Sequence, residues 1–292
     1  MPYNVKVLAD SIPEGGGRRL TTFEATYPRF IHAECLTHRV MSRNSASSRA
    51  IPIGKMIERV LTDPAMPLFW GKNQRGMQAA EELGEYEKRE ARDIWLRARD
   101  EAVDHVRELD DRGVHKQLSN RLLEPFMFIT TIITATEWDN FFHLRRDAAA
   151  QPEFKWLADE MFARQEERTP HVLPAGAWHL PLIDDQTRAE VQRLVEDEPD
   201  SGRMIHVRVN ELLCKIATGR CARVSYLTHD GRRDFHEDIA LHNRLSTSGH
   251  WSPFEHIAQA DSQSQRSGNF LGGWRQYRKQ FSHEHYATPK AP

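Results

Sequence analysis

The feature that most limits how this chain can fold is a run of polar side chains at residues 38–49. These twelve residues include three arginines, one histidine, four serines and one asparagine. Such a run cannot fill an apolar core, because each donor buried without a partner costs free energy. Arginine forks and serine hydroxyls suit the oxygens of an anion. The run therefore predicts an anion-binding segment or, alternatively, a solvated loop between two regular elements.

The composition sets the outer bounds. The chain has 292 residues, of which 39% are hydrophobic and 28% charged, so we expect a soluble globular protein with a core of useful size. Its net charge of −2 gives no overall attraction to nucleic acid or an anionic membrane, so a nucleotide site must be local. The apolar stretches are too short to cross a bilayer, and we see no secretory-type segment. Three cysteines, Cys35, Cys214 and Cys221, form no CxxC pair, which favours reduced thiols and a cytoplasmic location.

Periodicity in the first part of the chain predicts an α+β fold, in which a small antiparallel sheet packs with long helices. Residues 21–27 alternate as a strand does, after a turn at Gly15-Gly16-Gly17, and residues 30–36 are also strand-like. We expect a short helix over 54–62 and a long amphipathic helix, or a broken pair, over 77–109. A more buried helix is predicted over 115–136, and another over 152–164.

The second part of the chain predicts shorter elements. Three prolines make residues 169–181 an irregular, ordered loop. Helices are expected over 186–196, 210–218 and 235–248, with Gly219 ending the second. Residues 221–226 are a strand or a helix-end turn. The basic, aromatic tail at 268–281 is a leftover of a rearrangement of the chain, an added lid or a short nucleic-acid contact. No linker divides the chain, so we expect one domain over residues 1–292.

The spacing within residues 38–49 resembles the signature of the flavin-dependent thymidylate synthases. The family pattern depends on His, Arg, Ser, Asn, Ser and Arg, and the matching residues are His38, Arg39, Ser42, Asn44, Ser47 and Arg49. Three positions depart from it: the family has Arg, Glu and an aromatic residue where this chain has Thr37, Ser45 and Ala50. In that family the first half of the segment binds FAD and the second half binds the nucleotide.

A second segment, residues 249–256, reads G-H-W-S-P-F-E-H and closely matches a flavin-lining segment of the same family. An A-R-V-S segment precedes it in the family, and residues 222–225 match that segment. Taken without the resemblance, His250, Glu255 and His256 could be metal ligands. The segment could also be a turn that ends a helix, since Pro253 excludes a regular helix through it.

A third match covers residues 140–151. The family has a helix reading N-F-x-x-L-R with a later glutamine, and residues 140–145 and Gln151 fit it. The arginine contacts the pyrimidine in that family, which implies the same role for Arg145. An upstream arginine grips the phosphate, and Arg121 is its equivalent here. The family has a histidine at the position of Ala149. Its absence here implies that one contact to the flavin or the folate is missing or different.

The order of these motifs differs from that of the family, in which the two C-terminal segments come first. The resemblance therefore implies a circularly permuted domain, matched over residues 21–164 and 215–260, with 165–214 as a new connection. Permutation at exposed loops is physically acceptable, because termini usually lie on the surface and near each other.

The resemblance implies flavin-dependent methylation of dUMP to dTMP, with methylenetetrahydrofolate as carbon donor and NADPH as reductant. This route needs no protein nucleophile, and the cysteines here suit small apolar fillers. The implied FAD contacts are His38, Arg39, Asn140, Ser225, His250, Ser252 and Glu255. The implied nucleotide contacts are Glu34, Ser47, Ser48, Arg49, Arg121 and Arg145, with Arg145 and Ser47 as the catalytic residues. The family's sites form between subunits of a tetramer, so a homotetramer is also implied.

Other interpretations stay open. The departures at Glu34 (where the family tends to have Gln), Thr37, Ser45 and Ala149 could admit dCMP or divert the reaction to a hydroxymethyl product. A metal-dependent hydrolase using His250, Glu255 and His256 is an alternative from another class. A third is a nucleotide-binding protein without activity.

Overall fold

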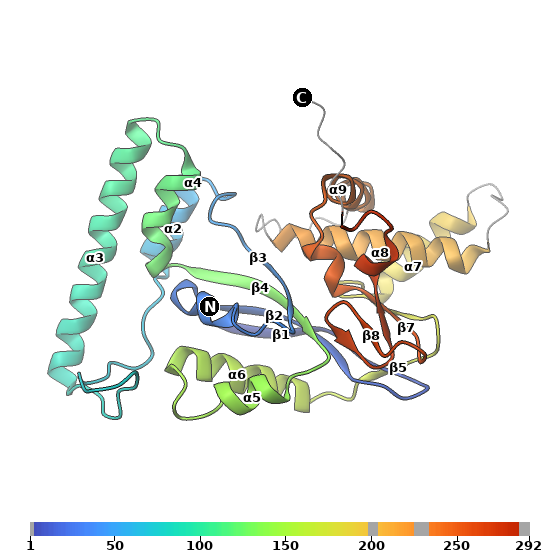
Figure 1. The fold of residues 1–292 in the computed structure, drawn as a ribbon. Coiled ribbons are helices and arrows are strands. Elements are labelled where there is room, and N and C mark those ends of the chain that lie inside the picture. Colours follow the sequence, from blue (N-terminus) through green and yellow to red (C-terminus); the bar gives the residue numbers. More distant parts are fainter. Residues whose placement is uncertain (1–2, 198–203, 225–233, 286–292) are drawn as a thin grey trace.

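Five strands form the central sheet of the computed structural model, which describes residues 3–197, 204–224 and 234–285. The sheet order is β3-β4-β2-β1-β5 (Figure 1). All neighbours are antiparallel except β1 and β5, which run parallel. The strands are β1 (Asn4–Pro13), β2 (Leu20–Pro28), β3 (Ser42–Ser45), β4 (Phe128–Ala135) and β5 (His171–Leu173). The fold is α+β, as the sequence predicted.

The two faces of this sheet differ in chemistry. Phe23 and Tyr27 of β2 and Ile133 of β4 are buried on one face, against α5 (Asp139–Arg145) and α6 (Pro152–Glu166). Because successive side chains of a strand point to opposite faces, Thr26 of β2 and Thr130 of β4 point to the other face, where their hydroxyls are hydrogen bonded at 2.9 Å. One face is therefore an apolar core. The other carries hydroxyls, with Ile132 and Thr134 buried beneath the C-terminal part and Thr26 and Thr130 half-buried.

A group of helices flanks one end of the sheet, on the left of Figure 1. It comprises α2 (Ile53–Thr62), α3 (Glu85–Asp111), α4 (Lys116–Ser119) and the 3-10 helix η2 (Asn120–Phe126). Met56 and Val60 of α2 pack with Val103 and Val106 of α3 in a separate apolar cluster. The short helices η1 (Arg29–Ile31) and α1 (His32–Cys35) connect β2 to the chain before β3.

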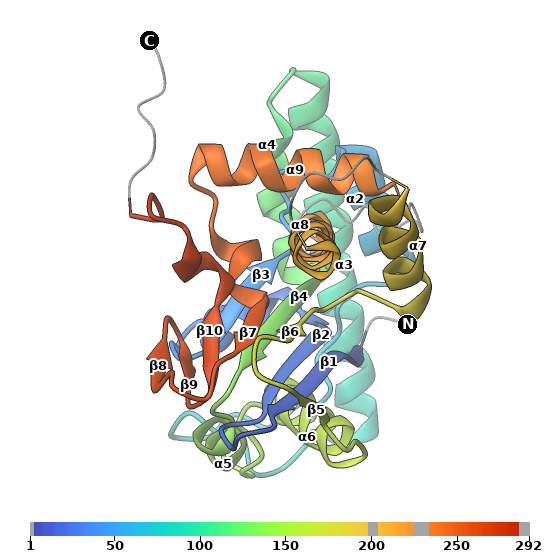
Figure 2. The ribbon, with the colours of Figure 1, turned by 90° about the vertical axis from the view of Figure 1, so that its right-hand side faces the viewer.

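The C-terminal part of the chain lies on the opposite side of the molecule (Figures 1 and 2). Its helices are α7 (Asp185–Glu196), α8 (Ile205–Arg223), α9 (Phe235–Ser248), η4 (Ser252–His256) and η5 (Tyr277–Gln280). Its strands are β6 (Trp178–His179), β7 (Ala258–Ala260), β8 (Arg266–Ser267), β9 (Phe270–Leu271) and β10 (Trp274–Gln276). Figure 2 shows α8 end-on, between α9 and the central sheet. No helix of the described residues is both long and apolar enough to span a membrane.

Buried polar contacts fasten this C-terminal part to the sheet. Thr134 of β4 hydrogen bonds to His256 Nδ1 at 2.8 Å and to Thr22 of β2 at 2.8 Å. Thr22 in turn bonds to His179 Nε2 at 2.8 Å, and His179 Nδ1 to Ser11 at 3.0 Å. Burial lowers the pKa of His179 and of His256 to about 3. This chain of hydrogen bonds therefore contains two neutral imidazoles. It connects η4 and β6 to the strands β4, β2 and β1.

Several predicted elements are confirmed, namely the strand at 21–27 and the helices at 54–62, 152–164, 186–196 and 235–248. Two predictions were wrong in type. Residues 30–36 are helical, because Ile31 and Cys35 are buried together one helical turn apart. The predicted helix at 115–136 ends at Phe126 and gives way to β4, whose β-branched Ile and Thr residues suit a central strand buried on both faces.

Three further predictions were wrong about where elements begin, end or occur. The helix predicted from residue 77 begins at Glu85, after the extended Gly84. The loop at 169–181 contains the short strands β5 and β6. Gly219 does not end a helix but lies inside α8, where a Cβ atom would come within 2.5 Å of the Asp238 carbonyl oxygen of α9. The glycine is there because the two helices cross closely.

We therefore expect Gly219→Ala to lower the free energy of unfolding by about 1–3 kcal/mol, as overpacking does. Gly54→Ala is the matched control, because its Cβ would meet nothing within 4 Å on α2 and should be neutral or slightly stabilising. Urea denaturation of both variants measures the difference. Equal stability of the two would contradict the close crossing.

Candidate active site

The polar run at residues 38–49 wraps around β3, the outer strand of the central sheet. Ser42 and Asn44 point toward the C-terminal part of the chain. Asn44 donates from Nδ2 to the Cys221 carbonyl at 2.7 Å, and Ser42 accepts from Gln276 Nε2 at 3.3 Å. Both side chains are buried. Two of the six motif positions thus dock the C-terminal part, and the others lie at the two ends of β3.

The guanidinium of Arg145, at the end of α5, is the centre of a cluster before β3. It donates to His38 Nε2 at 2.9 Å, to Glu34 Oε2 at 3.0 Å and more weakly to Thr37 Oγ1 at 3.4 Å. Its carbon lies 4.5 Å from the centre of the Phe154 ring. The Arg145 side chain is 20% exposed. Glu34 and Arg145, which the sequence predicted separately as nucleotide contacts, are therefore brought together, and the arginine fork is held in one orientation.

His38 is a neutral hydrogen-bond acceptor in this cluster. Burial lowers the pKa of His38 to about 4, with further contributions from the cations of Arg145 and Arg43. Its ring makes edge contacts with Phe141 at 5.1 Å and with Phe154 at 6.0 Å. A neutral imidazole can accept from Arg145 without adding charge, so the positive charge of the cluster lies on the arginine.

Arg43 holds the backbone that carries His38. Its Nη1 donates to the carbonyl of Cys35 at 2.6 Å and to that of His38 at 3.0 Å. Because Arg43 and Ser45 point to the opposite face of β3 from Asn44, this arginine reaches back under the turn. The motif pattern treats residue 43 as variable, so sequence reasoning missed this role.

A second cluster lies beyond the other end of β3, around the carboxylate of Glu124. Ser48 donates to Oε1 at 2.9 Å and Arg121 Nη1 donates to the same oxygen at 2.7 Å, while Arg29 lies 3.7 Å from Oε2. The structure therefore places two predicted nucleotide contacts, Ser48 and Arg121, on one carboxylate. Glu124 was not foreseen, although it lies three residues after Arg121.

The remaining nucleotide candidates lie beside this second cluster. Arg49 is exposed and has no hydrogen bond or ion pair within the described residues, and Ser47 is half-buried. His32, the first residue of α1, is also neutral here. Its pKa is lowered to about 4, first by burial and then by the nearby cations of Arg29 and Arg43. The arginines thus gather at both ends of β3, with Arg145 at one end and Arg29 and Arg121 at the other.

The flavin candidates fall into two groups. Arg39 and Asn140 are exposed near the first cluster and make no side-chain hydrogen bond within the described residues. Ser252, on the C-terminal part, donates to Asn44 Oδ1 at 3.2 Å, and Glu255 pairs with Arg278 at 2.5 Å. His250 is exposed, and its Nδ1 bonds to Ser248 at 2.8 Å. Ser225 lies outside the described residues.

The geometry gives no support to a metal site at residues 250–256. Within the described part of the chain, no group of three or more His, Cys, Asp or Glu side chains could hold a metal ion. His250 faces Ser248, Glu255 faces Arg278, and His256 is buried against Thr134. The three candidates therefore diverge.

Comparison with known proteins identifies the family. The model of the family described as "Thymidylate synthase complementing protein" matches residues 20–171, slightly more than half of the chain. The chain therefore belongs to this family, and the protein is an enzyme of the methyltransferase type. No curated protein sequence matches it.

Distant likenesses of fold accompany this match. A UMP/dUMP methylase PolB from Streptomyces cacaoi bound with 5-Br UMP is 16% identical, with a TM-score of 0.48 over 56% of this chain and 88% of that chain. The same enzyme bound with 5-Br dUMP is 16% identical, with a TM-score of 0.43 over 51% and 67%. The assignment to the family depends on the sequence match alone.

We expect the imidazole of His38 to titrate near pH 4, because its charged form is disfavoured by burial and by two arginines. Replacing the cation with Arg145→Met should raise this midpoint toward the ordinary value of about 6.5. NMR titration of the ring, assigned by comparison with His38→Gln, measures both. A midpoint at or above 6 in the unmodified protein would contradict the cluster geometry.

Proposed function

We propose that the protein methylates dUMP to dTMP, with methylenetetrahydrofolate as the carbon donor and FAD, reduced by NADPH, as the source of hydride. The observation that carries this proposal is the fixed guanidinium of Arg145, held by Glu34 and His38. A donor fork whose position does not change during reaction is suited to stabilising charge that develops on a pyrimidine ring. Membership of the family supports the same reaction class.

The nucleotide would lie along the edge of β3. Arg145 would face the pyrimidine and stabilise negative charge on it, with Ser47 as the second catalytic residue. Arg49 and Arg121 would bind the phosphate, together with the hydroxyls of Ser47 and Ser48. This assignment is supported by the exposure of Arg49. Arg121 and Ser48 now donate to Glu124, and they would have to turn from that carboxylate to the phosphate.

The candidate flavin residues fit an anionic cofactor. The cation of Arg39 and the amide of Asn140 are exposed and uncommitted within the described residues, so they can bind a phosphate or a ring edge. The carboxylate of Glu255 is neutralised by Arg278 and would not repel the cofactor. Bound reduced flavin would supply the hydride, while His38, Arg39, Asn140, His250 and Ser252 would orient it.

We also propose that one subunit does not contain a whole site. His250 and Glu255 belong to the C-terminal part. Each subunit would be a single permuted domain over residues 1–292. In a homotetramer with shared sites, segment 21–164 of one copy would meet segment 215–260 of another. Residues 165–214 would be the connection.

Arg145→Gln should lower kcat for dUMP methylation by about 100-fold or more, as the loss of one fixed donor to a developing charge does. Arg146→Gln is the matched control. The cation of Arg146 pairs with Asp159 and lies over the Phe162 ring, away from Glu34 and His38. That variant should stay within about threefold of the unmodified enzyme, as expected for a surface ion pair. A folded Arg145→Gln enzyme with unchanged turnover would sink the assignment.

The carboxylate of Glu34 favours a second candidate, dCMP. One of its oxygens accepts from Arg145, while the other makes no hydrogen bond within the described residues. That oxygen can accept from the exocyclic amino group of cytosine, whereas the corresponding oxygen of uracil would face it without a proton between them. The carbon donor and the flavin chemistry would be the same.

Glu34→Gln should therefore shift kcat/KM toward dUMP relative to dCMP, by about tenfold for one lost or gained hydrogen bond of this kind. Steady-state assays with each nucleotide measure the ratio, and the mass of the product distinguishes a methyl from a hydroxymethyl group. An unchanged ratio would show that Glu34 does not read the base.

A further inference from the structure

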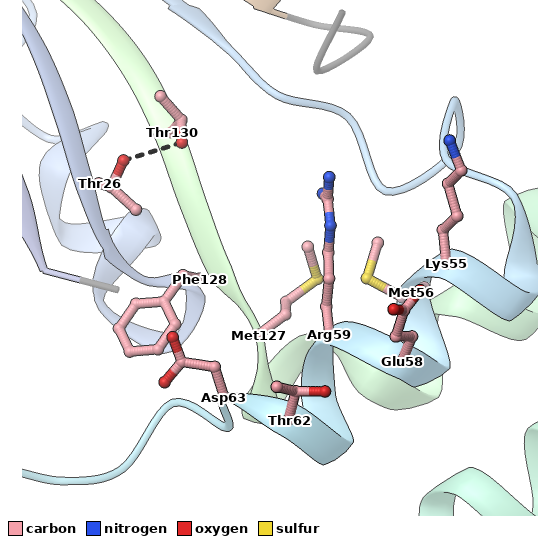
Figure 3. Close-up of a pocket in the computed structure, with 10 residues that line it drawn as sticks. All are labelled: Thr26, Lys55, Met56, Glu58, Arg59, Thr62, Asp63, Met127, Phe128 and Thr130. Carbon is pink, nitrogen blue, oxygen red and sulfur yellow. Dashed lines mark hydrogen bonds between the residues drawn. The ribbon is translucent and has the colours of Figure 1, made fainter. Parts of the chain in front are cut away.

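A cavity of about 570 Å³ lies between α2 and the hydroxyl-lined face of the central sheet, away from Arg145 (Figure 3). The buried Met56 and Met127 belong to one apolar cluster and form its base. The ring of Phe128 lines one end, and the hydroxyls of Thr26 and Thr130 form the sheet side. These groups form an apolar base beside a polar wall, which is the usual composition of a small-molecule site.

Two cations stand at the rim of this cavity. Lys55 and Arg59 lie on the same side of α2, one helical turn apart, and both extend upward past the methionine sulfurs in Figure 3. In the described ranges 3–197, 204–224 and 234–285, neither side chain has a hydrogen bond or an ion pair. The carboxylate of Asp63 points toward Phe128, away from them. Both cationic ends are thus available to a ligand at one end of the cavity.

The neighbouring carboxylates are not paired with these cations, although they balance the formal charge of the cavity lining. Glu58 and Asp63 also line the cavity, at spacings from Lys55 and Arg59 that commonly form ion pairs on a helix. No such pair is formed, although pairs at these spacings do form on α3, for example between Arg107 and Asp104. The cations of α2 are therefore left open on the cavity side.

We infer that this cavity binds an aromatic ring system carrying carboxylate or phosphate groups, as a second ligand site separate from the β3 edge. The ring would lie against Phe128, above the buried Met56 and Met127, and the anion would reach Lys55 and Arg59. Thr26 and Thr130 bond to each other through one proton, which leaves the other hydroxyl proton available to the ligand. Folates and phosphorylated nicotinamide dinucleotides share this chemistry. Their choice as probes rests on the proposed function, but the site itself does not.

The test uses the full chain and two probes, 5-formyltetrahydrofolate and NADPH, with binding measured by isothermal titration calorimetry. We expect one of them to bind the unmodified protein and to lose at least about tenfold in affinity in Lys55→Gln/Arg59→Gln, since two charge-assisted contacts are removed. The matched control is Arg92→Gln/Arg97→Gln, which removes the same charge from exposed positions of α3 that do not line the cavity. This control should bind as the unmodified protein does.

Three results would overturn the inference: neither probe binds, the α2 variant binds with unchanged affinity, or both double variants lose affinity equally. Thermal unfolding of each variant confirms that the exposed substitutions leave the fold intact. Binding of dUMP and dCMP, measured on the same samples, separates this site from the proposed function. If nucleotides bind but neither probe does, the cavity inference is wrong and the proposed nucleotide site stands. If a probe binds in an Arg59-dependent way but neither nucleotide binds, the proposed nucleotide site is wrong and the cavity inference stands.

Discussion

The alternation of side chains along β3 is the constraint on which the arrangement of the site depends. Asn44 points to one face and docks the C-terminal part through Cys221 and Ser252. Arg43 points to the other and holds the turn that carries His38 against Arg145. Successive side chains of a strand point to opposite faces. A shift of β3 by one residue would therefore turn Asn44 away from the C-terminal part and Arg43 away from the turn before β3. One short edge strand therefore joins the two halves of the chain and positions the catalytic candidate.

Much of the fold could be predicted where a local pattern decided the structure. The alternation in β2 and the amphipathic pattern of α2 were sufficient. β4 was mistaken for a helix because it is buried on both faces, and such a strand shows no alternation. Gly219 was taken as a helix end because its close approach to Asp238 depends on a helix that follows later in the chain. Tertiary packing decided both cases.

The candidate site could be predicted in its residues but less so in its contacts. The pairing of Glu34 with Arg145 joins residues that are far apart in sequence, and the resemblance supplied both. The resemblance did not show that Ser42 and Asn44 are used in docking, since a motif records residue types and not the faces on which they lie. The contributions of Arg43, Glu124 and Arg278 depend on backbone geometry and on ion pairs that no single stretch of sequence reveals.

The most direct test of the account is the visible absorption spectrum of the purified protein with FAD, titrated with dUMP and, separately, with dCMP. The account predicts a bound-flavin spectrum that changes on addition of a pyrimidine nucleotide, because both ligands would lie along the β3 edge. A change with dUMP supports thymidylate synthesis, and a change with dCMP alone supports the cytosine candidate. Absence of flavin binding in the presence of either nucleotide would contradict the central claim.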